Sequence, residues 1–398
     1  MNREPNKKYK KTIITLLTVA FFALLLIIGT SYFYIRHKIY VLPEQKKLND
    51  KILNQYIGEE NEGSEDEEYD EYKIKKRSSK EEEKYEEQKG ITNILLIGTD
   101  GRSLEERPRS DSIIVATIDD NNKNIKLTSI MRDSYVNIQG CKAQKINAAY
   151  ALGGPELLMS TIEKNFKIKL DRYVLVNFWG FQDIIDGIGG IDIDIKDYEI
   201  KEMNKYIGEV SNNKSPKISK AGIQRLDGQQ ALAYTRIRHV GNGSYERNLR
   251  QRVMLSTIAI KLKDTSIFQY PSLLSKILPH IRTNIEPAAV LNYVYTAFSF
   301  KPLEVKQLQM PLTELSEGRM YKGSWVILMD KEQNADVLND FIFRNASPDK
   351  EKINYTEYKR KINEYIRAER KANPTIKNEN YREINEPLEN DHSIFNEY

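Results

Sequence analysis

The segment Ile91-Thr-Asn-Ile-Leu-Leu-Ile97, followed by Gly98-Thr-Asp-Gly-Arg102, decides which fold this chain can adopt. Its first part is mostly apolar and has the length of one strand, which is typical of a strand covered on both faces. Gly98 ends the apolar run, and Asp100 and Arg102 follow at once. Ligands of α/β proteins bind beside the carboxyl ends of such strands. We therefore expect a functional site directly after this strand.

Strand-like and helix-like segments alternate along about 250 residues after this point, which predicts a single α/β domain. Further strands are expected over residues 112–118, 125–131, 173–178, 191–195, 305–310 and 324–329. Helices are expected over residues 155–162, 181–188, 226–235, 249–263, 271–278, 287–300 and 333–343.

Charged residues gather where the apolar segments end. Ten ionisable residues form this set, namely Asp100, Arg102, Arg109, Asp111, Arg132, Asp133, Arg236, Arg238, Arg247 and Arg250. Guanidinium groups are always charged and bind phosphate oxygens in pairs, so several of them in one place indicate a strongly anionic ligand. Aspartates among the arginines suit a hard divalent cation that bridges protein and phosphate. The set therefore predicts a pyrophosphate site.

The N-terminal part contains a candidate membrane anchor. Residues 12–35 carry no charge and are mostly apolar, and about 20 apolar residues suffice for a helix to cross a bilayer. A secretory signal peptide usually has a shorter apolar region and a small-residue cleavage site, which is not found here. Five basic residues precede the segment, whereas only Arg36 and Lys38 follow it closely. This asymmetry predicts a single-pass signal anchor, with residues 1–11 in the cytoplasm and the rest of the chain outside.

Polar segments flank the expected domain. Nine of the thirteen residues from 59 to 71 are acidic, and a mixed Lys/Glu run continues to Lys89. Such segments lack the apolar residues needed for a core. The expected division is therefore an acidic extracellular linker over 36–89, a catalytic domain over 90–345 and a polar tail over 346–398. Within the tail, residues 355–372 favour a helix but show no convincing apolar face, which is typical of a surface helix or a poorly ordered segment.

Composition excludes several other classes of protein. The net charge is only +4 and no basic helix suits a DNA groove, so nucleic acid is not an expected partner. Cys141 is the single cysteine, which excludes an internal disulfide and fits a bacterial surface. The four histidines are too scattered for a zinc site. No Walker, dinucleotide or Gly-x-Ser-x-Gly motif occurs.

Six motifs in a fixed order resemble the LytR-CpsA-Psr family. They are Ile97-Gly-Thr-Asp-Gly-Arg102, Arg109-Ser-Asp-Ser112, Ser129-Ile-Met-Arg-Asp133, Lys145-Ile-Asn-Ala-Ala-Tyr150 with Gly153-Gly154, Leu226-Asp-Gly-Gln-Gln-Ala-Leu-Ala-Tyr-Thr-Arg-Ile-Arg238 and Arg247-Asn-Leu-Arg-Gln251. Each motif alone is weak, but six in order are specific. The resemblance implies an α/β fold with a central mixed β-sheet between helices, a hydrophobic cavity for a polyprenyl tail and one N-terminal transmembrane helix.

The resemblance also implies an activity at the outer face of a Gram-positive cell membrane. Enzymes of this family transfer a glycopolymer, such as wall teichoic acid or capsule, from a polyprenyl-pyrophosphate carrier to peptidoglycan and form a phosphodiester. A hydroxyl that attacks a pyrophosphate needs charge neutralisation and in-line positioning, with little covalent help from the protein. Two alternatives stay open at this point. One is a hydrolase acting on the same carrier, and the other is a non-catalytic surface or regulatory protein that binds polyprenyl phosphates.

The resemblance assigns roles to the same side chains that the charge pattern selects. Asp100 and Asp111 would hold Mg²⁺ (or Mn²⁺) against the phosphate oxygens. Either Asp100 or Asp133 would accept the proton of the attacking hydroxyl, beside a catalytic Arg132. Lys145 and Asn147 would bind a phosphate or the first sugar. The residues expected to bind the pyrophosphate are Arg109, Arg132, Lys145, Arg236, Arg238, Arg247 and Gln251.

Two positions depart from the pattern of the family. Ser244 stands where an acidic residue usually precedes the arginine matched by Arg247, so either Glu246 replaces that residue or an orienting contact is missing. Met131 stands where proline is common, and we expect it to affect only the shape of the backbone. Neither departure removes an expected ligand of metal or phosphate. The apolar stripes at 157–162 and 181–185 would either line a lipid cavity or form ordinary core.

Overall fold

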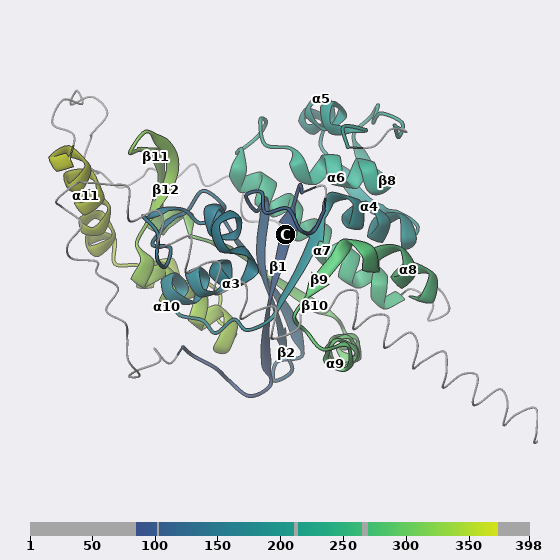
Figure 1. Ribbon diagram of the computed structural model, residues 1–398, viewed down its shortest axis with the longest axis horizontal. Helices are drawn as coiled ribbons and strands as arrows, with labels where there is room; N and C mark the ends of the chain where they lie inside the picture. The colour runs from purple at the N-terminus through teal and green to yellow at the C-terminus, as the bar shows by residue number, and fades with distance from the viewer. Residues whose placement is uncertain (1–84, 102, 211–213, 265–269, 373–398) are drawn as a thin grey trace, which may run out of the picture.

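A six-stranded mixed sheet lies at the centre of the protein (Figure 1). The computed structural model describes residues 85–101, 103–210, 214–264 and 270–372. The strand order is β10-β3-β2-β1-β6-β9, in which β1 runs antiparallel to β2 and parallel to β6. The expected central mixed sheet is therefore confirmed. Its strands are β1 (Ile91–Thr99), β2 (Ser112–Asp119), β3 (Asn124–Ile130), β6 (Tyr173–Asn177), β9 (Ile281–Thr283) and β10 (Glu304–Met310).

Helices cover both faces of this sheet (Figure 1). On one face, α3 (Asn147–Phe166) packs against α10 (Lys331–Phe343). On the other, α7 (Ser244–Asp264) crosses β3 and β10. The remaining helices on that side are α4 (Phe178–Gly187), α5 (Asp197–Tyr206), α6 (Gly228–Arg236), α8 (Tyr270–Ile277) and α9 (Pro287–Ser299).

Three short two-stranded sheets accompany the central one. They pair β4 (Tyr135–Val136) with β5 (Gln144–Lys145), β7 (Ile191–Ile195) with β8 (Gly222–Leu226), and β11 (Ser316–Tyr321) with β12 (Ser324–Met329). The sequence pattern predicted β7 and β12 but not their partners, because β8 and β11 carry charged residues and glycines.

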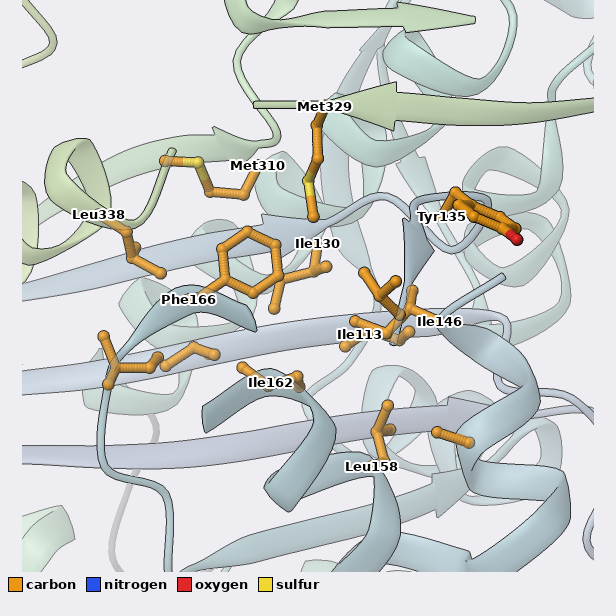
Figure 2. Packing of buried hydrophobic residues seen from close by; sticks show 14 of the residues in the cluster. Ile113, Ile130, Tyr135, Ile146, Leu158, Ile162, Phe166, Met310, Met329 and Leu338 are labelled. Carbon is orange, nitrogen blue, oxygen red and sulfur yellow. The ribbon is translucent and has the colours of Figure 1, made fainter. Parts of the chain in front are cut away.

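The main hydrophobic core lies between the sheet and the layer formed by α3 and α10 (Figure 2). Ile113 and Ile130 point from the sheet toward Phe166 of α3 and Leu338 of α10. The expected stripe over 157–162 belongs to this core, since Leu158 and Ile162 are both 0% exposed. It is ordinary core rather than the lining of a lipid cavity.

Helix α3 begins earlier than the sequence pattern predicted. The expected start was Pro155, whereas the helix extends from Asn147 to Phe166 and bends at Gly153–Gly154. Gly154 has a φ of 67°, a left-handed value that glycine adopts without steric cost. The two glycines therefore allow one helix to change direction immediately before Pro155.

Helix α11 (Tyr355–Ala372) corrects one expectation about the C-terminal part. The expected helix is present, but it does have an apolar face, formed by Tyr358, Ile362 and Ile366. All three are at most 2% exposed and belong to the main core. Their spacing of four residues gives a stripe only one residue wide, which is easily overlooked among charged neighbours. The folded part therefore continues past the expected end at residue 345.

The predicted anchor over 12–35 lies outside the described residues, as does nearly all of the expected linker. Among the helices of the described part, none is long and apolar enough to cross a membrane.

We expect Ile362→Ala to lower the free energy of unfolding by about 2–4 kcal/mol, because it would leave a cavity in a close-packed core. Thermal and urea unfolding followed by circular dichroism would measure the change. Thr356→Ala, on the exposed side of the same helix, is the control and should change stability by less than about 0.5 kcal/mol. Equal effects of both substitutions would contradict the packing of α11 into the core.

Candidate active site

The ends of three neighbouring strands bring the expected site residues together. Asp100 follows β1, Asp111 precedes β2, and Arg132 lies two residues after β3. Because β1 and β2 are antiparallel, with Gly98 opposite Ser112, the end of one strand meets the start of the other. The amide of Asp111 donates to the carbonyl of Gly98 over 2.9 Å. The sheet therefore places both aspartates at one edge, as the sequence predicted.

The carboxylate of Asp111 is the centre of the site. Nη1 of Arg132 donates to its Oδ1, and Nη2 of Arg247 lies 3.3 Å from the same oxygen. Nη2 of Arg247 also donates to the backbone carbonyl of Asp111 over 3.2 Å. Burial raises the pKa of Asp111, but the charges of Arg247 and Arg132 outweigh it and lower the pKa below its usual value. Asp111 is therefore ionised and holds both arginines in place.

Asp100 is exposed and lies close to this centre. Burial of part of its carboxyl group and the negative charge of Asp111 raise the pKa of Asp100, while Arg236 and Arg132 oppose the rise. These electrostatic effects show that Asp100 faces both Asp111 and the arginines. Within the described part of the chain, Asp100 forms no ion pair, so its oxygens are available to a ligand.

Asp133 is already engaged. Its Oδ1 lies 2.7 Å from Nζ of Lys145, and its Oδ2 lies 3.7 Å from Nε of Arg132. The structure therefore places Lys145 near Arg132, because the buried Asp133 contacts both cations. Of the two candidates for the general base, Asp100 is the more accessible one, whereas Asp133 holds Lys145 and Arg132.

Arg236 and Arg238 lie in different surroundings, although they are only two residues apart. Arg236 ends α6, and its guanidinium lies between the rings of Phe178 and Tyr206, with centroids 5.1 Å and 4.8 Å away. This aromatic clamp could not be inferred from the sequence. Arg238 is exposed in the following loop, and its charge contributes to lowering the pKa of Arg247, after the larger effect of burial.

Two of the predicted ligands differ in burial. Gln251 is buried one helical turn after Arg247, which places both side chains on the same side of α7. Arg109 is exposed and forms no hydrogen bond or ion pair within the described residues, so its role stays a prediction. Arg102 lies outside the described residues.

Several buried polar atoms around this centre have no hydrogen-bond partner. Buried polar groups in folded proteins are nearly always paired, so unpaired atoms gathered in one place indicate that a polar ligand completes them. They include Oγ of Ser110, Nε of Arg132, Oδ1 of Asn147, Nε of Arg247 and Oε1 of Gln251.

Arg252 is a further buried cation that the sequence motifs did not single out. Its Nη1 donates to Oγ of Ser129, three residues before Arg132, and its Nε has no partner. Burial lowers the pKa of Arg252 to about 10. No carboxylate pairs with it within the described residues. Arg252 lies just beyond the last sequence motif and two residues after Arg250, whose role is structural. The sequence pattern therefore did not indicate a binding role for it.

The contact expected of Glu246 is made to a different arginine. Its carboxylate accepts from Nη2 of Arg250 over 2.5 Å and from the amide of Asn242 over 2.9 Å. Arg250 also donates to Glu199 over 2.6 Å, so it forms a buried ion-pair network within the helical layer. Glu246 therefore does not replace the acidic residue of the family for Arg247, which Asp111 orients instead.

Asp100 and Asp111 are the side chains that fit a divalent cation. No group of three or more histidine, cysteine, aspartate or glutamate side chains could hold a metal ion within the described part. Two carboxylates suffice for Mg²⁺ when substrate phosphates and water supply the other ligands. Burial and, after it, the negative charge of Asp111 raise the pKa of Asp100, and a cation between the two carboxylates would relieve their repulsion.

The comparisons with known proteins identify the family. The LytR_cpsA_psr family model matches residues 57–342. The chain belongs to this family. The resemblance inferred from the six LytR-CpsA-Psr motifs is thereby confirmed.

Three relatives illustrate the likeness. MsrR of Staphylococcus aureus, a regulatory protein, is 33% identical over 261 residues, which are 64% of this chain and 75% of MsrR. TagU of Bacillus cereus, a polyisoprenyl-teichoic acid–peptidoglycan teichoic acid transferase, is 36% identical over 196 residues, or 48% of this chain and 60% of TagU. The solved structure of TagT bound to LI-WTA is 27% identical, with a TM-score of 0.53 over 65% of this chain and 91% of TagT; TagT is from B. subtilis.

We expect inorganic pyrophosphate to raise the unfolding temperature of this LytR-CpsA-Psr protein even in EDTA, because it would pair with the cluster of arginines in the folded state only. Arg247→Met should abolish most of the shift, as measured by differential scanning fluorimetry. Arg225→Met removes the same charge from an exposed pair with Asp192 and should leave the shift intact. A shift that survives Arg247→Met would place the anion elsewhere.

Arg252→Met should raise the free energy of unfolding by about 1–3 kcal/mol. A pKa lowered from 12.5 to about 10 corresponds to a cost of about 3 kcal/mol for the buried charge at neutral pH, and the lost bond to Ser129 offsets about 1 kcal/mol of the gain. Urea unfolding in the absence of phosphate would measure the change, with Arg225→Met again as the control. A loss of stability would mean that the folded protein already pairs this guanidinium.

Proposed function

We propose that this protein transfers a glycopolymer, of the wall teichoic acid or capsule type, from a polyprenyl-pyrophosphate carrier to a hydroxyl of peptidoglycan. The product is a phosphodiester. The observation that carries this proposal is the set of cations around Asp111, in which Arg132 and Arg247 are fixed while neighbouring buried polar atoms have no partner. Such a site suits a ligand with two adjacent phosphates.

The relatives support the same reaction. TagU is named as a transferase of teichoic acid to peptidoglycan, and TagT has been solved with a wall teichoic acid precursor. The motif residues of the family coincide with the side chains that meet in this site. The name of MsrR points to regulation, which does not conflict with catalysis at the cell wall.

The residues of this chain divide the chemical work. Arg132, Arg236 and Arg247 bind the pyrophosphate and neutralise the charge that develops on the leaving phosphate. Asp100 accepts the proton of the attacking hydroxyl, because it is exposed and forms no ion pair within the described part of the chain. Asp133 is a positioning residue, since it holds Arg132 and Lys145. Asp100 and Asp111 would hold Mg²⁺ (or Mn²⁺), which when bound supplies charge neutralisation and orientation at the phosphate oxygens.

An incompletely covered apolar face of the sheet supports a lipid-linked substrate. Side chains on this face include Leu96, Ala116, Ile118, Val174 and Val176. All five are only partly buried, although they lie on central strands next to helices. On the opposite face, the corresponding apolar residues are almost completely buried. Ile94 and Ile114 on the same face are buried, so the partly covered side chains are the ones that a polyprenyl tail would contact.

We also propose that the domain works outside the cell, on a single N-terminal anchor formed by residues 12–35. The apolar sequence of this segment and the excess of basic residues before it support this placement. Peptidoglycan and the glycopolymer carrier would then both be within reach of the domain.

The decisive experiment uses the full-length protein in nanodiscs, with a polyprenyl-pyrophosphate-linked sugar, a short peptidoglycan acceptor and Mg²⁺. Mass spectrometry should detect sugar phosphate joined to the acceptor and release of polyprenyl monophosphate. Asp100→Ala and Arg132→Ala should each lower the rate about 10²–10³-fold. EDTA should abolish transfer, and Mg²⁺ or Mn²⁺ should restore it. Arg225→Met is the matched control and should leave the rate unchanged.

Other outcomes would contradict the proposal in defined ways. Release of free sugar phosphate without capture by the acceptor would indicate a hydrolase. Tight binding of the lipid without turnover would indicate a binding or regulatory protein. Transfer that persists in EDTA would remove the metal from the reaction while keeping the transferase.

A further inference from the structure

The β11–β12 hairpin lies directly beside the phosphate site. The amide of Ile327 on β12 donates to the carbonyl of Asp133 over 2.9 Å, and Ile327 pairs in parallel with Ser134. Trp325 lies two residues before Ile327 on the same strand. The hairpin, which lies next to α11 (Figure 1), therefore contacts the backbone of Asp133, whose carboxylate contacts Arg132 and Lys145.

Trp325 is held flat against this hairpin. Its cross-strand neighbours are Met320, which is directly opposite, and Gly318, which is diagonal to it. A Cβ atom added to Gly318 would lie only 2.7 Å from Cζ2 of Trp325, so the ring occupies the space that a side chain would need. One face of the indole therefore packs on the hairpin backbone. Trp325 nevertheless remains 40% exposed, and Met320 is 59% exposed.

Contacts at both ends keep the hairpin in place. Near its base, Tyr245 of α7 hydrogen-bonds with Ser316. Near its turn, the amide of Lys322 donates to Glu369 of α11. On the opposite face of the hairpin, Tyr321 packs edge-on against Tyr135 and Tyr365 at centroid distances of 5.0 Å and 6.0 Å. An aromatic surface on such a support needs little ordering when a ligand binds.

We propose that the exposed face of Trp325 stacks on a pyranose ring of a glycan whose reacting group lies at the arginine cluster. A pyranose ring has one face of C–H groups, which fits the negative face of an aromatic ring. Tryptophan is enriched among the residues that contribute most to binding, and Met320 beside it enlarges the exposed apolar surface. The choice of a sugar rests on the proposed function, because the glycans of that reaction would extend from the site whose Asp133 contacts this hairpin.

Intrinsic fluorescence tests the platform without any turnover. The chain has two tryptophans, so in full-length Trp179→Phe the emission comes from Trp325 alone. Titration with a tetramer of N-acetylglucosamine, in detergent micelles, should give a saturable blue shift as the ring leaves water. Emission that stays unchanged up to millimolar sugar would overturn the proposal. A blue shift of the same size in a variant that also carries Arg247→Met would show that the sugar binds independently of the phosphate site.

Kinetics then identify the source of the sugar. Trp325→Leu keeps an apolar side chain but removes the ring. It should raise the KM for one of the two substrates about tenfold, which corresponds to about 1.4 kcal/mol, with little change in kcat. A rise for the peptidoglycan acceptor assigns the platform to the acceptor, and a rise for the lipid-linked donor assigns it to the donor. Trp325→Tyr should restore most of the affinity.

The controls separate the two proposals. Tyr355→Leu removes another exposed aromatic ring, on α11, and should leave both KM values unchanged. Unchanged KM values in Trp325→Leu with an intact unfolding temperature would contradict the platform while leaving the transferase untouched. If the unsubstituted protein transfers nothing, the proposed function fails, and the fluorescence titration still decides whether Trp325 binds sugar.

Discussion

The shared carboxylate of Asp111 is the interaction on which the site depends. It holds Arg132, which follows β3, and Arg247, which comes from α7, so it joins the edge of the sheet to the helical layer above it. Antiparallel pairing of β1 and β2 places Asp111 beside the end of β1 and hence beside Asp100. One ionised group thereby sets the positions of cations that lie more than a hundred residues apart in the chain.

Some buried polar atoms of the cations around Asp111 have no hydrogen-bond partner. Arg132 and Arg247 share the carboxylate of Asp111, Arg132 also lies 3.7 Å from Asp133, and the Nε atoms of both arginines are buried without a hydrogen-bond partner. Nearby, Arg252 is buried against a hydroxyl rather than a carboxylate. Unpaired buried charge lowers stability, and proteins usually avoid it unless a ligand supplies the counter-charge. Two adjacent phosphates would satisfy several of these groups at once, which explains why the folded protein tolerates them.

The sequence predicted those features that depend on local pattern. Apolar runs indicated β1, which ends near Gly98, and the neighbouring β2 and β3, and motif order located Asp100, Asp111 and Arg132 at their ends. Features that depend on contacts between residues far apart in the chain could not be predicted from the sequence. The rings that enclose Arg236 come from α4 and α5, and the pairing of Arg252 with Ser129 depends on how α7 crosses β3. For α11, helical propensity predicted the helix, but its narrow apolar stripe among charged residues was not recognised, so its burial was not predicted.

The arrangement also bears on how a transferase would avoid hydrolysing its substrate. Asp100 is exposed, so the described part of the chain does not shield the proposed base from water. An acceptor hydroxyl must therefore compete with water by binding energy rather than by enclosure. In the proposals above, the partly covered apolar face of the sheet would contact the lipid, and the Trp325 hairpin would contact the sugar. Binding energy from contacts on these two surfaces, away from the reacting phosphorus, would hold the acceptor hydroxyl in line with the phosphorus. The acceptor would then occupy the position that an attacking water molecule needs.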